Sequence, residues 1–189
     1  MGRVCCGLRP WVPPGAVLGC APIYKLQGVG VNKQDDFAPT VVLGHEEMAP
    51  YVKADAAGEP LFRLPGSSAR PLPYLGYAPG AYLGAVTDWM LKQSGTVIHV
   101  DRVYETDMAE GLKGMALEGH GLAFLPQSAV RKELQTGALV QVSLPGEALP
   151  TLTMEVRAYR EKPSSRQVPK RSAQDLWAYL SQSLSPAKV

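Results

Sequence analysis

Residues 108–143 read MAEGLKGMALEGHGLAFLPQSAVRKELQTGALVQVS, and the order of patterns along this stretch decides the fold class. Apolar side chains recur at helical spacing in its first third, which predicts a helix with Asp107 as its N-cap. Residues 121–125 form a short, nearly all-apolar run, which is typical of a strand at the centre of a parallel sheet. A second helix is predicted next, with Pro126 at its first position and Gly137 just past its end.

Alternating strand and helix patterns continue on both sides of this stretch. Before it, strand patterns at 71–77 and 96–104 flank a helix pattern at 81–93, and after it a further strand pattern covers 138–144. Strands that alternate with helices in this way predict an α/β fold with parallel strands. A fold of that kind binds its ligands at the carboxyl ends of the strands.

The outer parts of the chain carry weaker patterns. We expect short strands over 37–44 and around 50–53, and, near the C-terminus, a strand over 151–159 followed by a helix over 173–184. Residues 1–36 show no helical period and are interrupted by proline and glycine, so they cannot form one regular element. We therefore expect an irregular leader there.

Composition and charge exclude several classes of protein. The chain has 189 residues, 46% of them apolar, which is enough for a hydrophobic core. With 19 Lys and Arg against 17 Asp and Glu, the net charge of +2 gives no general attraction to nucleic acid. No apolar run is long enough for a transmembrane helix. The sequence shows no motif of a nucleotide-binding loop, a serine hydrolase or a zinc protease, so we expect no enzyme activity, cofactor or metal.

The three cysteines, Cys5, Cys6 and Cys20, all lie in the leader. An odd number crowded into one short segment does not form a disulfide framework. Residues 17–20 read VLGC, which loosely resembles a lipid-attachment box, although prolines break the apolar stretch before it. The leader therefore allows two interpretations, an irregular segment or a lipoprotein signal.

Two helix starts stand out as candidate ligand-binding positions, at residues 80–82 and 106–107. The first N–H groups of a helix have no partner within the helix, so they suit an anion or another polar ligand. His120 stands between two glycines and is interpreted either as a ligand contact or as an exposed turn residue. Met108 is interpreted either as a core residue or as an oxidation sensor, because sulfoxide formation makes its side chain polar.

The stretch quoted above resembles the C-terminal effector-binding domain of LysR-type transcriptional regulators. That family shares a helix that ends in small turn residues, a Gly-x-Gly turn, a short apolar strand, Leu-Pro, a helix, and then Glu-Leu-x-x-Gly-x-Leu-Val. The matching residues here are Met115, Ala116, Gly119, His120, Gly121, 122–125, Pro126, Glu133, Leu134, Gly137, Leu139 and Val140. The resemblance covers about residues 37–186, and the detail at 82–84 and at Met108 is most similar to the hypochlorite-responsive members.

The resemblance implies the fold of type II periplasmic-binding proteins, in which two α/β subdomains flank a cleft that holds a small effector. By this resemblance, residues 49–144 form the second subdomain, which is largely complete, while residues 37–48 and 145–186 form the remnant of a truncated first one. The effector contacts that the resemblance implies are Pro79, Gly80, Ala81, Tyr82, Thr106, Asp107 and His120.

The parallel sheet also predicts where these residues meet. Gly80, Tyr82, Asp107 and His120 each lie in a turn that begins or precedes a helix or strand of one sheet. We therefore expect them to converge at one edge of that sheet. Met108 is expected near the same edge, but mostly packed.

The resemblance implies an effector-sensing fragment of a bacterial LysR-type regulator, which binds a small molecule or senses an oxidant in the cytoplasm. Such a regulator reads DNA through an N-terminal helix-turn-helix, and no such pattern precedes residue 80, so the chain alone is not expected to bind DNA. No membrane is implied, and the family forms homo-oligomers. The alternative is a secreted or lipid-anchored solute-binding protein of the same fold, which needs a working signal peptide in residues 1–20.

Overall fold

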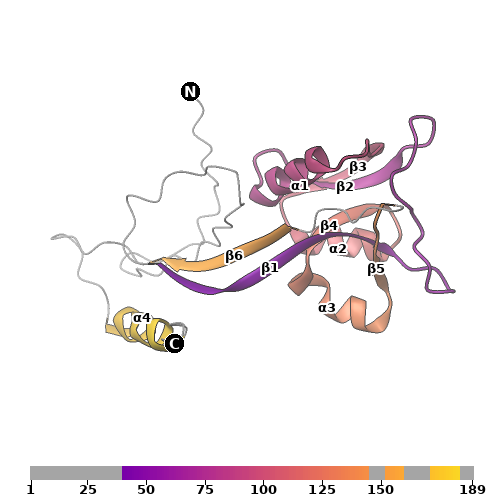
Figure 1. Cartoon of the computed structure of the whole chain (residues 1–189). Helices are drawn as coiled ribbons and strands as arrows, with labels where there is room; N and C mark the ends of the chain where they lie inside the picture. Colours follow the sequence, from indigo (N-terminus) through magenta and orange to yellow (C-terminus); the bar gives the residue numbers. More distant parts are fainter. Residues whose placement is uncertain (1–39, 145–151, 160–170, 184–189) are drawn as a thin grey trace, which may run out of the picture. The chain divides into compact units, whose positions relative to one another are not determined.

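The computed structural model describes residues 40–144, 152–159 and 171–183 (Figure 1). These residues fall into two compact units, which are described separately. The first unit contains 47–144 and Leu152, and the second contains 40–46, 153–159 and 171–183. The leader expected at 1–36 lies outside the described residues, and the subdomain boundaries expected from the sequence stay predictions.

Six strands and four helices make up the described part of the chain. The strands are β1 (Thr40–Lys53), β2 (Leu72–Tyr77), β3 (Val100–Thr106), β4 (Leu122–Pro126), β5 (Leu139–Gln141) and β6 (Leu152–Tyr159). The helices are α1 (Tyr82–Gln93), α2 (Ala109–Leu117), α3 (Gln127–Thr136) and α4 (Arg171–Ser183). From β2 to β5, strands and helices alternate as the sequence predicts.

Five strands form the sheet of the first unit, in the order β3-β2-β4-β1-β5, and β1 contributes to this unit from residue 47 on. β2 is parallel to both of its neighbours, β3 and β4, as expected. β1, which precedes the alternating stretch, is antiparallel to β4 and to β5, so β5 runs in the same direction as β4 and the predicted parallel direction of the strands from β2 to β5 is confirmed.

β1 runs unbroken through Pro50, where the sequence predicts two separate strands. Residues 48–52 are all buried, and Pro50 stands opposite Phe124 in the ladder with β4. The proline lacks an N–H, but its carbonyl accepts a hydrogen bond from the N–H of Val142, at 3.1 Å. The free energy gained by burying both faces of the strand therefore outweighs the loss of one backbone hydrogen-bond donor at Pro50.

The starts of β3, α2 and α3 differ from the sequence prediction, whereas the predicted end of α3 is confirmed. β3 begins four residues late, and Pro126 is the last residue of β4 and the N-cap of α3 rather than the first helical residue. The N-cap of α2 is Met108, not Asp107. The cause is local, because the N–H of Met108 donates to Oγ1 of Thr106, at 3.3 Å, and the helix starts one residue later. Gly137 ends α3 with a φ of +70°, as its left-handed cap requires.

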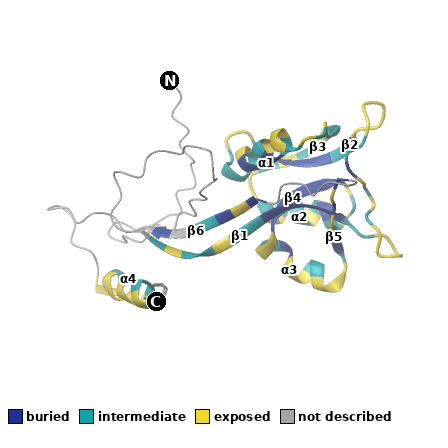
Figure 2. Cartoon of the chain, viewed as in Figure 1, coloured by how far each residue is buried: buried dark blue, intermediate teal, exposed yellow. Residues whose placement is uncertain are grey.

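α1 and α2 cover opposite faces of this sheet. α1 packs closely on the end of β2, where a Cβ on Gly84 would lie 3.1 Å from Cβ of Tyr77. Thr106 pairs with Tyr77 at the end of β2 and packs closely against Gly111 of α2. α1 connects β2 to β3, and α2 connects β3 back across β2 to β4, so the two right-handed crossovers run in opposite directions and their helices lie on opposite faces. Buried strands β2 and β4 lie between the two helices (Figure 2).

In the second unit, β6 pairs with β1, and α4 begins two residues before the helix predicted over 173–184, whose last residue lies outside the described residues. Met154 and Ala158 of β6 are fully buried, as is most of Trp177 in α4. Leu180, one turn further along, is half-buried. None of the helices in the described ranges is long and apolar enough to cross a membrane.

Gly121 is required by the close approach of β4 to β2. A Cβ on Gly121 would overlap the carbonyl oxygen of Pro73 and lie 2.9 Å from its carbonyl carbon. We predict that Gly121→Ala lowers the free energy of unfolding by about 1–3 kcal/mol, because the obstacle is backbone and cannot swing aside. Gly114→Ala on α2 is the control, since a Cβ there meets open space, and it should be neutral or stabilise by up to about 1 kcal/mol. Urea unfolding measures both, and equal stability of the two variants would contradict this explanation.

Candidate effector-binding edge

The parallel pairing of β2 with β3 brings two helix starts to one edge of the sheet. Tyr77, the last residue of β2, pairs with Thr106, the last residue of β3. The N–H of Ala78 then donates to the carbonyl of Thr106, at 2.9 Å, so the turn after β2 is fastened to the end of β3. We refer to residues 78–82 and 106–108 as the carboxyl edge.

The turn after β2 depends on a glycine. Gly80 has a φ of +85°, a left-handed conformation that other residues rarely adopt. The N–H of Ala81 donates back to the carbonyl of Ala78, at 3.0 Å. Pro79 and Gly80 are exposed, whereas Ala81 and Tyr82 are half-buried. The contacts predicted in this segment therefore form one short, accessible turn that leads into α1.

The start of α2 stands beside this turn. Thr106 is half-buried and Asp107 is exposed, and the carbonyl of Met108 accepts a hydrogen bond from the N–H of Leu112, at 3.3 Å. The side chain of Met108 is 61% exposed, so the prediction that it is mostly packed is wrong. As the N-cap, Met108 precedes the first helical turn and does not join the buried stripe of α2, to which Leu112 belongs.

His120 lies at the opposite end of the sheet. It stands just before β4, and β4 is parallel to β2, with Leu122 at its start paired with Tyr74 near the start of β2. Tyr82, by contrast, follows the end of β2. The predicted convergence of Tyr82 and His120 is therefore wrong. Only a turn that follows a parallel strand lies at the carboxyl end, whereas the turn at His120 precedes its strand, and the residue is exposed.

A third helix start adjoins the carboxyl edge, and the sequence did not indicate it as a ligand-binding position. β4 ends at Pro126 and α3 begins at Gln127, and the parallel pairing of β4 with β2 puts this junction at the same end of the sheet. The N-cap residues of α1, α2 and α3 all lack a side-chain cap. Three helix N-termini, each the positive end of a helix dipole, therefore gather here. The available signal was a proline directly after an all-apolar strand.

Lys113 ties α2 to α3 close to this edge. Its Nζ lies 2.7 Å from a carboxylate oxygen of Glu110 and 3.7 Å from one of Glu133, and it donates to the carbonyl of Ala129, at 3.1 Å. The hydrogen bond with Glu110 raises the pKa of Lys113, against the lowering effect of desolvation. Because Glu110 lies in the first turn of α2 and Ala129 in the first turn of α3, this lysine holds the two turns in a fixed relation.

Tyr74 of β2 supports the same edge from within the hydrophobic core. It is 3% exposed, and its ring meets that of Phe124 edge to face, with 6.3 Å between the centroids. Burial raises the pKa of Tyr74 to about 12, while the positive charge of Arg102 acts in the opposite direction. Through its contact with Phe124, this buried ring connects β2 to β4.

The carboxyl edge is suited to bind a ligand mainly through backbone groups. It offers main-chain N–H groups, the hydroxyl of Thr106, the carboxylate of Asp107 and the thioether of Met108. Such groups can hold a polar small molecule through hydrogen bonds and helix dipoles. Within the described ranges, no group of three or more His, Cys, Asp or Glu side chains is placed to hold a metal ion.

Comparison with known protein families identifies the family of the chain. The family described as the LysR substrate binding domain matches residues 32–185. The chain belongs to this family. LysR substrate-binding domains have the fold of type II periplasmic-binding proteins and serve as the regulatory part of LysR-type regulators, so the fold class implied by the sequence is confirmed.

Two curated relatives are transcription regulators. The HTH-type transcriptional regulator YjiE of Escherichia coli (strain K12) is 29% identical over 128 residues, which are 67% of this chain and 39% of that protein. The HTH domain-truncated transcriptional regulator QseD of Escherichia coli O157:H7 is 28% identical over 128 residues, which are 67% of this chain and 49% of that protein. This LysR substrate-binding domain therefore matches less than half the length of either relative.

Solved structures show the same fold. The apo-form of the regulatory domain of HypT from Salmonella typhimurium has a TM-score of 0.67 and 24% identity, with 84% of this chain and 69% of that chain covered. The bromide ion-bound form of that domain has a TM-score of 0.66 and the same identity, with 84% and 68% covered. At this identity the likeness concerns the fold alone.

The burial of Tyr74 predicts that stability depends on pH. Its pKa of about 12 in the folded chain exceeds the ordinary value of 10.0, so its contribution is fully present below pH 10 and is lost as the pH rises towards 12. Between pH 9 and 11, the wild type should lose about 1 kcal/mol more unfolding free energy than Tyr74→Phe, which has no proton to lose there. Urea unfolding at the two pH values measures the difference. Equal losses in both proteins would show that the hydroxyl is not buried as described.

Proposed function

We propose that this chain is the effector-sensing domain of a LysR-type regulator and that it binds a small molecule at the carboxyl edge. The observation that carries the proposal is that the turn 78–82 and the starts of α2 and α3 share one end of the sheet in a LysR substrate-binding domain. Sheets of this type bind ligands at the carboxyl ends of their parallel strands. The proposal gives the chain a cytoplasmic, regulatory and non-enzymatic role.

The proposed site keeps six of the seven contacts expected from the sequence. These are Pro79, Gly80, Ala81, Tyr82, Thr106 and Asp107. His120 is left out because it precedes β4 at the other end of the sheet. The start of α3 at Gln127 is added because it follows β4 at the same end.

The helix ends at the edge favour a ligand that is negatively charged or accepts hydrogen bonds, and the exposed carboxylate of Asp107 is the one charged side chain among residues 78–82 and 106–108 that opposes an anion. A helix N-terminus carries about half a positive elementary charge, and three such ends gather here. The first turns of α1 and α3 contain no acidic residue, and the acidic residue in the first turn of α2, Glu110, is paired with Lys113 at 2.7 Å. The bromide ion held by the regulatory domain of HypT supports an anion as the ligand class.

Sodium bromide is the probe that tests this proposal. Titrated into the isotope-labelled chain at constant ionic strength, it should shift the amide resonances of residues 80–82 and Met108 in a saturable way. Tyr82→Ala should raise the half-saturating bromide concentration by about tenfold, because the variant removes a hydroxyl donor and apolar surface at the first turn of α1.

His120→Ala is the matched control for this titration. It also removes a ring from a turn, but from one at the other end of the sheet, and it should bind bromide as the wild type does. Absence of a saturable shift at the carboxyl edge, or equal weakening by the two substitutions, would refute the proposal.

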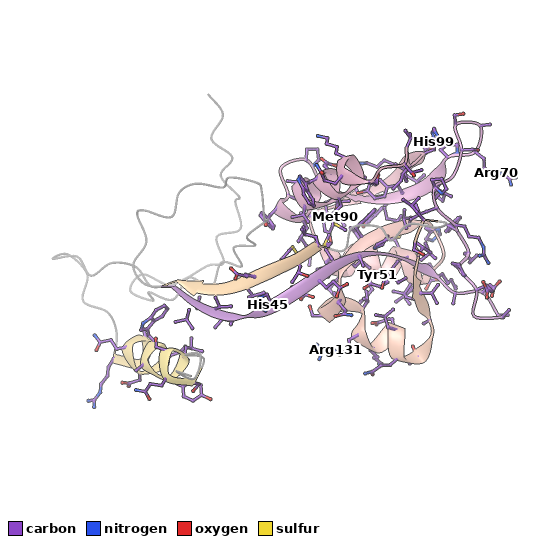
Figure 3. The ribbon with its side chains drawn as sticks, viewed as in Figure 1. His45, Tyr51, Arg70, Met90, His99 and Arg131 are labelled. Atoms are coloured by element: carbon purple, nitrogen blue, oxygen red, sulfur yellow. The ribbon has the colours of Figure 1, made fainter. Side chains whose placement is uncertain are left out.

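Oxidant sensing at Met108 is a second candidate function, and the exposure of this side chain favours it. Met108 is 61% exposed, whereas Met90 of α1, which Figure 3 labels, is 1% exposed. Hypochlorite transfers an oxygen atom to a thioether, which leaves chloride and a polar sulfoxide. The full-length HypT of Salmonella is described as a hypochlorite-specific LysR-type transcriptional regulator, which supports the same class of signal for this chain.

Limited treatment with hypochlorite tests the second candidate. Peptide mass spectrometry should find sulfoxide at Met108 at an oxidant dose that leaves Met90 unchanged, because the thioether of Met90 is shielded. Treatment should change the half-saturating bromide concentration of the wild type and leave that of Met108→Leu as it was. Equal oxidation of the two methionines, or the same response in Met108→Leu, would count against oxidant sensing.

A further inference from the structure

We infer that Arg102 is the positioning residue of the carboxyl edge: its guanidinium clamps the end of β3 onto β2 and thereby fixes the turn 78–82. As far as it concerns ligand affinity, this inference rests on the proposed function. The contacts that support the clamp are independent of any ligand.

Arg102 reaches from β3 onto β2 through three contacts. Its Cζ lies 5.6 Å from the centroid of the Tyr74 ring, within the range of a cation–π interaction. Its Nη1 donates to the carbonyl of Tyr77 over a long 3.4 Å and lies 3.0 Å from a carboxylate oxygen of Glu105. Tyr77 stands directly before the turn and Glu105 directly before Thr106, so one guanidinium connects the two strand ends that form the edge.

The clamp stands where the backbone ladder is weakest. β3 has β2 as its one neighbour among the described strands, and the register between them shifts between Tyr74 and Leu75. Arg102 pairs with Tyr74, immediately before this irregularity, and its side chain reaches past it to Tyr77. A side-chain contact therefore spans the point at which the backbone pairing is interrupted.

Gly76 makes room for the guanidinium. A Cβ on Gly76 would lie 2.8 Å from Nε and 3.1 Å from Cζ of Arg102. Gly76 is not among the glycines with positive φ, so its backbone conformation does not require glycine. The same Cβ would lie 3.0 Å from Cε1 of Tyr74, so the space taken by the arginine and by the ring beneath it is the physical reason for a glycine at this position.

Two substitutions remove the clamp in different ways. Arg102→Ala deletes the guanidinium, whereas Gly76→Ala keeps its charge and displaces its flexible end. In both variants, hydrogen exchange at the N–H groups of Ala78 and Ala81, which bond across and within the turn, should be about tenfold faster. The N–H of Val142, which bonds to Pro50 in the same unit, is the internal reference and should change by less than about twofold.

The matched controls are Arg131→Ala and Gly114→Ala. Arg131 is exposed on α3 (Figure 3), and a Cβ on Gly114 meets open space, so neither substitution should alter exchange at Ala78. Unchanged exchange at Ala78 and Ala81 in the two clamp variants would overturn the inference. An equal rise at Val142 would also overturn it, because the arginine would then merely stabilise the whole unit.

Bromide binding separates this inference from the proposed function. The clamp variants should raise the half-saturating bromide concentration by about threefold to tenfold, because binding must then order the turn as well. If the wild type binds bromide and both variants bind it equally well, Arg102 does not position the site. If the wild type binds no bromide, the proposed function fails, while the exchange measurements still decide whether Arg102 clamps the turn.

Discussion

The parallel register of β2 and β3 is the constraint on which the rest of the first unit depends. With Tyr77 opposite Thr106, the hydrogen bond from Ala78 to Thr106 closes the gap between the two strand ends. The same register turns the side chain of Thr106 towards Gly111, where α2 begins to cover its face of the sheet. A slip of one residue would turn that side chain to the other face and separate the two helix starts.

The candidate site takes its character from the backbone more than from its side chains. No side chain caps the N-terminus of α1, α2 or α3, so the main-chain ends of these helices determine the local field. Other side chains hold these helix ends in place: Lys113 joins α2 to α3, Tyr74 joins β2 to β4, and Arg102 spans the irregular point of the ladder. A site formed mainly by helix ends needs no catalytic or metal-binding motif of side chains, and the sequence shows none.

Local chemistry made much of this fold predictable. The apolar run at 121–125 and the glycine at 137 have meanings that neighbouring residues alone determine, and the structure confirms both. The direction of β1 could not be predicted in this way, because it depends on pairing with strands far along the chain. His120 was misplaced because a turn before a strand and a turn after one look alike in sequence, although they lie at opposite ends of a parallel sheet. The exposure of Met108 depends on a shift of one residue in the start of α2, caused by the hydroxyl of Thr106.

The most direct test of the central claim is the position of a bound anion. Crystals of the chain soaked in sodium bromide and measured at the bromine absorption edge would locate it by anomalous scattering. We expect a peak at the first turns of α1 and α2, next to Leu83 and Ala109, because the N–H groups of Ala81 and Met108 already bond to Ala78 and Thr106. A peak beside His120, with none at the carboxyl edge, would contradict the claim that the ends of β2 and β3 form the ligand site.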